Sequence, residues 1–230
     1  MRCVLLLLSM TLCPVFAGKM PLNRVQKYAA YKAHTILPET LRFLVKKNGK
    51  HLFEGMDRGL RVPLSKINDQ VILREAGRIT ALVDSRANFP KVVRQMGFVA
   101  GLVAVYTNPS HNTRSGVQDG FAFYLNLKLN KCLFVFDGYS SLDDTYSWLR
   151  SELRAVPRRN ADHRHLLEDR YKGVDDDIYH RFNEQDAVFG VSSIYFSNMA
   201  RLSAHLWYYA WGSAHGDLTR MPFKGEVKKD

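Results

Sequence analysis

The sequence predicts an all-α fold, a single-domain multi-helix bundle, from three observations. Apolar residues recur at intervals of three and four positions through most of the chain. Residues that cap helices, such as Asn, Ser and Asp, precede several of these apolar stretches. The 230-residue length and the 46% hydrophobic content suffice for one sizeable core, and no internal repeat is visible.

The amino-terminal half is assigned from helical periodicity and from turn residues. The Pro90 helix is apolar nearly all round, which predicts a central place in the core, and its Gly97 and Gly101 predict close packing. The predicted segments are a helix from about Leu22 to Pro38, a second over 39–47, a short helix or helical turn over 51–60, a long helix capped by Ser65 with its apolar face from Ile67 to Val83, and the helix begun by Pro90 after Asn88.

The carboxyl-terminal half alternates polar and apolar stretches. The predicted segments are a long polar loop from Thr107 to Gly120, a helix over 121–129, a short strand or buried turn over 133–136, a helix over 142–155 with a capping box of Ser141 and Asp144, a linker over 157–160, a polar helix over 161–171, a turn at 175–177 and a long last helix opened by Asn183 or Asp186. That last helix carries Trp207, Tyr208, Tyr209 and Trp211 in near succession, so we expect at least one of them to meet solvent or a partner.

The first residues have the features of a secretory signal. Arg2 supplies the positive start, and an apolar stretch runs to Phe16, too short to span a bilayer. The predicted domains are therefore a signal peptide at 1–17, cleaved between Ala17 and Gly18, and a helical domain at 18–230. We expect a secreted or periplasmic protein. A lipoprotein signal ending at Cys13 fits less well, because Leu12 is larger than the residue that the lipoprotein peptidase prefers.

Cysteine content and charge limit the function classes. Cys3 and Cys13 lie in the predicted signal, so the mature chain keeps Cys132 alone and cannot form an internal disulfide. The net charge of +11 favours an anionic partner, which includes anionic small molecules, phospholipid head groups and polyanions. The basic residues are spread along the chain, so no dedicated nucleic-acid arm and no transmembrane segment is predicted. The alternative is that the charge serves solubility alone.

The candidate site residues come from the polar loop and from the histidines. The Thr107 to Gly120 loop follows the most apolar helix, and a loop in that position places side chains at a cleft between helices. We therefore predict Asn108, His111 and Arg114 as ligand-binding residues. His34 lies near the end of the first helix, and histidines from separate helices often build metal sites in bundles, so His34 and His111 are the candidate metal ligands. Each histidine alone also fits a structural role.

The chain resembles the secreted zinc-dependent phospholipase C proteins and the related single-strand-specific zinc nucleases. The residues that carry the resemblance are His34 in the first helix, the Pro109 and His111 pair after an apolar helix, and the long helix that follows later. The resemblance implies that family's all-helical fold. It also implies a cluster of zinc ions that activates a water molecule against a phosphodiester.

The sequence departs from the family pattern at several metal positions. Counting back from His111 places Val105 and Gly101 where the family has Asp and His. In the last helix Asn198 and Leu202 stand where the family has His and Glu. Apolar side chains cannot bind zinc. If the resemblance holds, these substitutions predict an eroded metal site.

Two hypotheses follow for function: in the first the chain is a binding protein, and in the second it is an enzyme. The first is an exported basic helical protein without a required cofactor, which binds an anionic ligand such as a phosphodiester or a lipid head group through the loop at 107–120. The second is an active zinc-dependent phosphodiester hydrolase. Its ligands would be His34, His111 and one or more aspartates; Asp57, Asp69 and Asp84 are the spare carboxylates.

Overall fold

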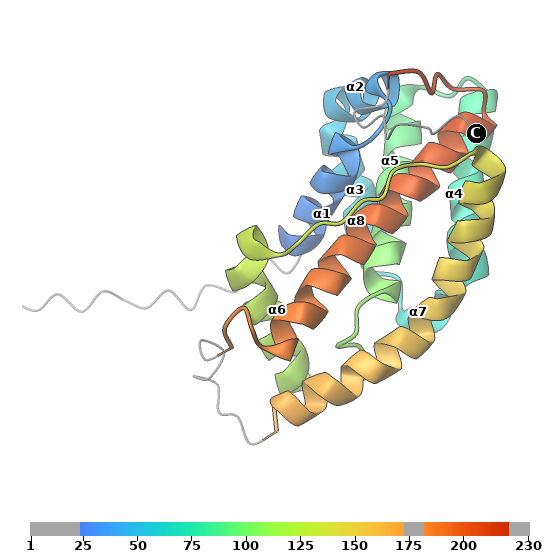
Figure 1. Cartoon of the computed structure of the whole chain (residues 1–230). Helices are drawn as coiled ribbons and strands as arrows, with labels where there is room; N and C mark the ends of the chain where they lie inside the picture. Colours follow the sequence, from blue (N-terminus) through green and yellow to red (C-terminus); the bar gives the residue numbers. More distant parts are fainter. Residues whose placement is uncertain (1–23, 173–181, 221–230) are drawn as a thin grey trace, which may run out of the picture.

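The computed structural model describes residues 24–172 and 182–220, and every regular element in these ranges is helical. The predicted all-α class is therefore confirmed, and the helices pack side by side (Figure 1). The elements are α1 Arg24–Thr35, α2 Glu39–Lys47, α3 Gly49–Gly59, the 3-10 turn η1 Leu64–Lys66, α4 Asp69–Asp84, α5 Phe89–Tyr106, α6 Ser115–Lys128, the 3-10 turn η2 Leu129–Lys131, α7 Leu142–Arg170 and α8 Ala187–Ser213.

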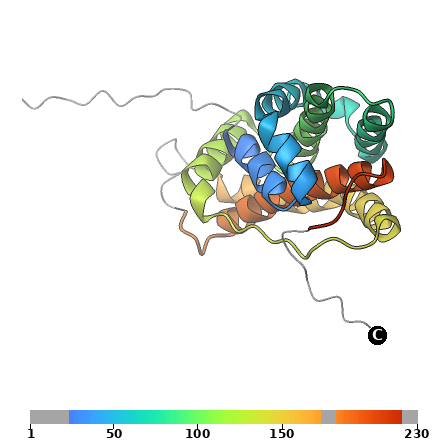
Figure 2. The same ribbon diagram turned by 90° about the horizontal axis from the view of Figure 1, so that it is seen from above.

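Helices α5 and α8 form the centre of the core. The middle and end of α5 are buried without interruption from Val99 to Tyr106, as its all-round apolar sequence predicts. Trp207 of α8 is fully buried, and its indole N–H donates to the Met96 carbonyl of α5 at 3.0 Å. Figure 2 shows α8 between the group α3, α4 and α5 on one side and α7 on the other.

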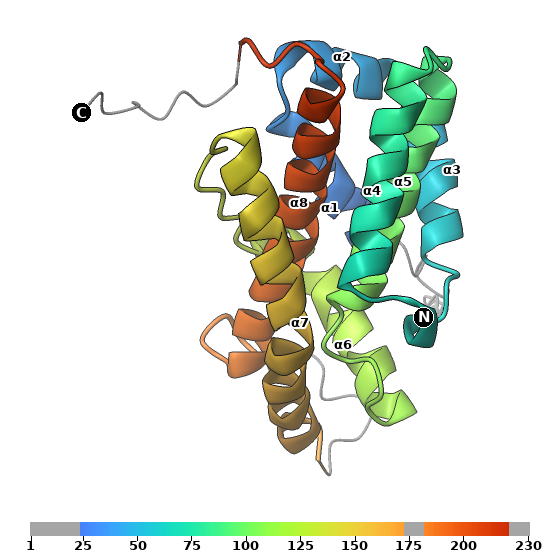
Figure 3. The same ribbon diagram turned by 90° about the vertical axis from the view of Figure 1, so that its right-hand side faces the viewer.

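Helices α3 and α5 touch backbone to backbone through four glycines. Gly55 and Gly59 of α3 face Gly97 and Gly101 of α5, and a Cβ at any of the four would overlap the backbone of the other helix. The contacts advance in the same direction along both helices, so α3 and α5 run parallel (Figure 3). The predicted close packing at Gly97 and Gly101 is confirmed. Because the two backbones touch, polar side chains of α3 lie close to polar side chains of α5; Glu54 and Arg94, for example, are hydrogen-bonded at 2.9 Å.

Two predicted helix starts differ from the structure. Ser65 lies in η1 and is not the cap of α4. That helix begins at Asp69, and its cap is Asn68, whose side chain accepts the Val71 N–H at 2.8 Å. The predicted loop at 107–120 is shorter, because α6 already begins at Ser115. Asn68 thus caps α4 through its side chain, whereas α6 begins after Arg114 without a side-chain cap.

The predicted linker at 157–160 is wrong, because α7 continues through it from Leu142 to Arg170 with Pro157 inside the helix. Side chains just after the proline hold the helix in place. Arg159 donates to the Glu152 carboxylate at 3.1 Å, and the Asn160 amide donates to the Tyr106 carbonyl of α5 at 2.9 Å. Pro157 leaves the Leu153 carbonyl without its helical donor, and the Tyr106 hydroxyl of α5 donates to that carbonyl at 3.2 Å.

Residues 132–141, called the strap below, cross the outside of α8 in extended form (Figure 1). The strap forms no sheet ladder among the described residues, so neither a strand nor a turn at 133–136 is found. Serine hydroxyls of α8 hold it: the Leu133 N–H donates to Ser193 at 3.5 Å, and the Val135 N–H donates to Ser197 at 3.2 Å. The strap thereby joins α6 to α7 across the bundle.

The predictions at the chain start and at 175–177 lie outside the described residues. They include the signal peptide and its cleavage position at Ala17 and Gly18. In residues 24–172 and 182–220, no helix is both long enough and apolar enough to cross a bilayer.

Candidate functional site

A cleft of about 290 Å³ opens where α3, α4 and α5 meet, and basic side chains surround it. We call it the basic cleft. The α3–α5 glycine contact forms its frame, since Arg58 lies next to Gly59 and Phe98 next to Gly97. The cleft is lined by Arg58, Glu75, Arg78, Lys91, Arg94, Gln95 and Phe98.

The only carboxylate among the lining residues belongs to Glu75, whose residue is 4% exposed. Its Oε2 accepts hydrogen bonds from Arg78 at 2.7 Å and from the Gln95 amide at 3.1 Å. Arg74 lies 3.6 Å from Oε1. The Gln95 amide also donates to the Glu75 carbonyl at 3.0 Å, so α4 and α5 are tied together at this point. These partners compensate the burial of a charged carboxylate.

Arg94 is held at the α3 side of the cleft. Its guanidinium donates to the Glu54 carboxylate at 2.9 and 3.3 Å, and His51 lies 3.0 Å from the same carboxylate oxygen. The hydrogen bonds from His51 and then from Arg94 lower the pKa of Glu54. Glu54 is therefore ionised at neutral pH and fixes the orientation of Arg94.

Two cations of the basic cleft have no acidic partner in the described parts of the chain. The side chains of Arg58 and Lys91 are exposed at its rim, and neither forms an ion pair with a described carboxylate. Four cationic groups thus face one carboxylate. An anion that enters the cleft meets guanidinium and ammonium donors, which favour the recognition of phosphate and carboxylate groups.

A second basic cleft of about 520 Å³ lies on the other side of α4, against α7 and α8. Its cations are Arg74, Arg150 and Arg154, and Arg154 lies 3.4 Å from Asp69. Tyr146 and Tyr209 stack at its wall with ring centroids 5.1 Å apart. Of the four aromatic residues near the end of α8, Tyr209 is thus the one that reaches the surface, while the other three are buried.

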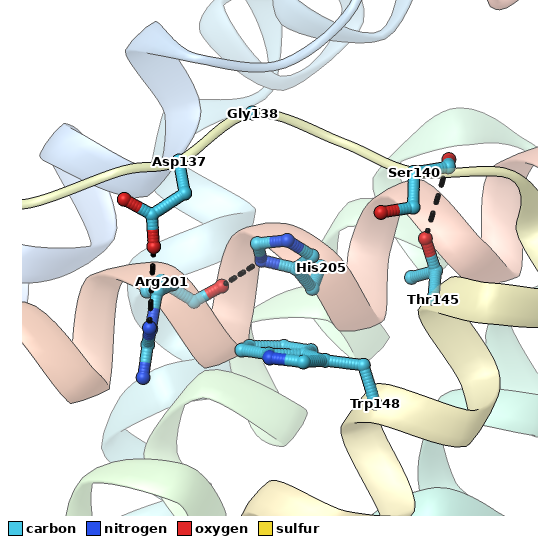
Figure 4. Close-up of a pocket in the computed structure, with 7 residues that line it drawn as sticks. All are labelled: Asp137, Gly138, Ser140, Thr145, Trp148, Arg201 and His205. Carbon is cyan, nitrogen blue, oxygen red and sulfur yellow. Dashed lines mark hydrogen bonds and ion pairs between the residues drawn. The ribbon is translucent and has the colours of Figure 1, made fainter.

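A third pocket of about 210 Å³ lies under the strap (Figure 4). Its cation, Arg201, is already bound: the guanidinium donates to Glu152 at 3.0 Å and lies 3.8 Å from Asp137. The same guanidinium stands 5.0 Å above the ring centre of Trp148. Because two carboxylates balance this arginine, the pocket offers little attraction to an anion.

His205 forms the floor of the pocket under the strap. Its ring lies 4.3 Å from the ring of Trp148, and Nδ1 donates to the Arg201 carbonyl at 2.9 Å (Figure 4). Burial is the main cause that lowers the pKa of His205, and the charge of Arg201 lowers it further. Backbone hydrogen bonds to Arg201 and Gly138 oppose this shift, as does the charge of Asp137. A neutral, hydrogen-bonded imidazole fits a structural role.

The structure places the three ligand-binding residues predicted from the loop outside these clefts. The Asn108 side chain accepts from the backbone N–H and the hydroxyl of Ser110, so it stabilises the loop itself. Arg114 is exposed at the start of α6. His111 is half-buried, and burial lowers its pKa. None of the three lines any of the clefts described above.

The structure does not bring His34 and His111 together. The end of α1 joins α2 at one end of the bundle, and the segment 107–114 lies at the other end (Figures 1 and 3). His34 Nε2 donates to the Arg42 carbonyl at 3.0 Å, which ties α1 to α2. In residues 24–172 and 182–220, no three His, Cys, Asp or Glu side chains are grouped so that they could hold a metal ion.

The basic cleft was not predicted, because its residues come from three helices and share no motif. One signal in the sequence points to it. Glu75 falls between Ile72, Ala76 and Ile79 on the buried face of α4. A carboxylate on an apolar face requires a cationic or hydrogen-bonding partner from a neighbouring helix. That pattern identifies a polar contact at Glu75, but it does not identify Arg78 and Gln95 as the partners.

Comparison with protein-family models, with curated proteins and with solved structures gave no match for this chain.

Proposed function

We propose that this protein binds a small anionic ligand that carries a phosphate group, and that the basic cleft between α3, α4 and α5 is the site. One observation carries the proposal: four cationic side chains converge there on a single buried carboxylate. Two of the cations, Arg58 and Lys91, have no described acidic partner. The anionic ligand expected from the net charge of +11 thus has a specific place to bind.

The charge of the cleft favours a phosphate group with two negative charges over a carboxylate with one, because four cationic groups surround a single carboxylate. Guanidinium groups present paired donors that match tetrahedral oxyanions as well as carboxylates, and an ammonium group adds a point charge. A volume of about 290 Å³ admits a phosphate with a few further atoms. The close glycine contact of α3 and α5 holds Arg58 and Arg94 on a rigid frame, which lowers the entropy cost of binding.

The resemblance to zinc-dependent phospholipase C enters the proposal as a statement about the order of the helices alone. A first helix with His34, an apolar α5, a polar segment with His111 and a long α8 follow one another in that order. The separation of His34 and His111 at opposite ends of the bundle counts against a metal site that they share. Under the proposal the metal site is eroded, and the protein acts as a binding protein outside the cytoplasm, as its predicted signal peptide implies.

Charge reversal at the two unpaired cations tests the proposal. Calorimetric titration of the mature protein with inorganic phosphate should give a dissociation constant that rises on the order of tenfold for Arg58→Glu, an effect of about 1.4 kcal/mol. Lys91→Glu should act in the same direction. Lys47→Glu on α2 makes the same charge change outside the cleft and should leave the affinity unchanged. Equal losses in all three variants would show unspecific electrostatics and would overturn the proposed site.

The loop at 107–120 is tested in the same titration. Arg114→Glu places the same charge change at the start of α6, where the sequence predicts ligand binding. Under the proposal Arg58→Glu weakens phosphate binding and Arg114→Glu does not. The reverse result would assign the ligand to the loop. Binding to the cleft should also weaken as salt rises, because the exposed part of the charge is screened.

A further inference from the structure

We infer that Glu75 makes the basic cleft selective for oxyanions that carry their own hydrogen-bond donor, so that hydrogen phosphate binds and sulfate is rejected. The inference rests on the proposed function of the cleft and goes beyond it by naming the ligand class and the residue that selects it. Its basis is the position of one carboxylate among cations that attract anions.

The hydrogen bonds of Glu75 are unevenly distributed between its two oxygens. Oε2 accepts from Arg78 at 2.7 Å and from Gln95 at 3.1 Å. Among the described residues, the cation beside Oε1 is Arg74, at 3.6 Å, which is longer than a hydrogen bond. An ionised carboxylate has about four acceptor positions and no donor. Glu75, which lines the cleft, therefore keeps acceptor capacity that no hydrogen bond from the described residues uses.

An anion that enters the cleft either lacks a hydrogen-bond donor for Glu75 or supplies one. Sulfate is an acceptor only, so its oxygens are repelled by the Glu75 carboxylate and leave that carboxylate unsatisfied. Hydrogen phosphate has nearly the same shape and keeps one O–H, which can donate to Glu75 while its other oxygens accept from the cations. Charge attracts both anions, but only the second completes the hydrogen bonds of the cleft.

The burial of Glu75 makes the discrimination strong. The Glu75 side chain is only 6% exposed, so water can replace a missing ligand donor only in part. A site built to exchange a hydrogen bond with its ligand rejects an analogue that lacks the partner atom, because a buried polar group is then left unpaired. The same chemistry admits an organic phosphate only if it presents an O–H beside the cleft wall.

Titrations of the wild-type protein with phosphate, sulfate and methyl phosphate test this inference. At about pH 8.5 all three anions carry two charges, and only hydrogen phosphate keeps a proton on oxygen. We expect wild-type protein to bind phosphate at least on the order of tenfold more tightly than sulfate or methyl phosphate, which corresponds to about 1.4 kcal/mol. Equal affinities for phosphate and sulfate would overturn the inference and leave the proposed function intact.

Glu75→Gln separates selection from a structural role. Its amide keeps an acceptor for Arg78 and adds a donor for the anion, so sulfate should bind and the phosphate-to-sulfate ratio should fall towards one. Glu39→Gln, which removes an exposed carboxylate of α2 that pairs with Arg220 and lies outside the cleft lining, should keep the wild-type ratio. An unchanged ratio in folded Glu75→Gln would overturn the inference, and failure of the wild type to bind any of the three anions would overturn the proposed function with it. The wild-type ratio decides the matter even if Glu75→Gln does not fold.

Discussion

At the residue scale, four glycines set the separation of α3 and α5. Gly97→Ala places a Cβ against the carbonyl of Leu52, which is backbone and cannot rotate away. We expect the free energy of unfolding to fall by about 3 kcal/mol or more, beyond the usual cost of overpacking. Urea denaturation measures the change.

A matched glycine on α4 provides the control for this substitution. A Cβ at Gly77 meets no atom within 4 Å. Gly77→Ala should therefore stabilise the protein by about 0.5–1 kcal/mol, since alanine favours helix more than glycine does. If both variants have the same stability, the close backbone contact of α3 and α5 does not exist in solution.

One buried and three half-buried histidines make the free energy of unfolding depend on pH. Burial is the first cause that lowers the pKa of His34, His111, His163 and His205. The unfolded chain therefore takes up protons at a higher pH than the folded chain does. The contribution of these histidines to the free energy of unfolding is fully present above about pH 6.5, their pKa in the unfolded chain. It is lost as the pH falls from there towards their lower pKa values in the folded protein.

We expect His205 to account for a measurable part of this pH dependence. His205→Gln keeps a donor for the Arg201 carbonyl and removes the titration. Unfolding free energies between pH 7.5 and 5 should show a smaller slope in this variant, with a full pKa unit worth about 1.4 kcal/mol. His165→Gln, at an exposed position on α7, is the control and should keep the wild-type slope. Equal slopes in the wild type and His205→Gln would contradict the prediction.

At the element scale, the strap depends on hydroxyl groups of α8. Ser197 accepts from the Val135 N–H at 3.2 Å and donates to the Val135 carbonyl at 3.3 Å. Ser197→Ala should cost about 0.5–1.5 kcal/mol for each hydrogen bond and should speed hydrogen exchange at the Val135 amide.

Ser192 offers the comparison on the same helix. Its hydroxyl is fully buried, and its oxygen has no hydrogen-bond partner in the described residues. Ser192→Ala should therefore be neutral or stabilising and should leave the exchange rate at Val135 unchanged. Faster exchange in both variants would mean that the strap does not depend on the Ser197 hydroxyl.

Helix α7 shows the limit of local signals at this scale. Pro157 removes a backbone N–H and predicts an interruption. The helix nevertheless continues, because the Tyr106 hydroxyl of α5 donates to the Leu153 carbonyl that Pro157 leaves without a donor, and Asn160 donates to the Tyr106 carbonyl. The sequence alone shows the proline and hence predicts an interruption. The contacts that compensate for it form only when α5 and α7 pack together.

At the scale of the whole molecule, ligand binding should raise thermal stability. An anion that binds the folded state alone stabilises it by about 2.7 kcal/mol at a hundred times its dissociation constant. For a chain of this size that corresponds to a rise in melting temperature of roughly 5–10 °C.

We expect this rise with hydrogen phosphate and a much smaller one with sulfate. Arg58→Glu should lower the phosphate response, whereas Lys47→Glu should not. The measurement is a thermal melt at constant ionic strength, which separates binding at the cleft from general screening of the +11 net charge. Identical shifts for both anions in the wild type would indicate an ionic effect without selection.

The sequence by itself determined the helical class, most helix positions and the central place of α5. These follow from periodicity and capping, which are local properties. The helix that Pro90 starts after Asn88 is found as predicted, and of the two predicted openings of α8, Asn183 and Asp186, the structure has Asp186. It also marked Gly97 and Gly101 as packing positions. Only the tertiary structure decided which charges meet. Arg58, Glu75 and Arg94 lie on three helices, and their convergence depends on which helix packs against the glycines of α5, which spacing along the chain does not encode. The same holds for His34 and His111. The sequence marks both as candidate metal ligands, and only the packing of the helices places them at opposite ends of the bundle.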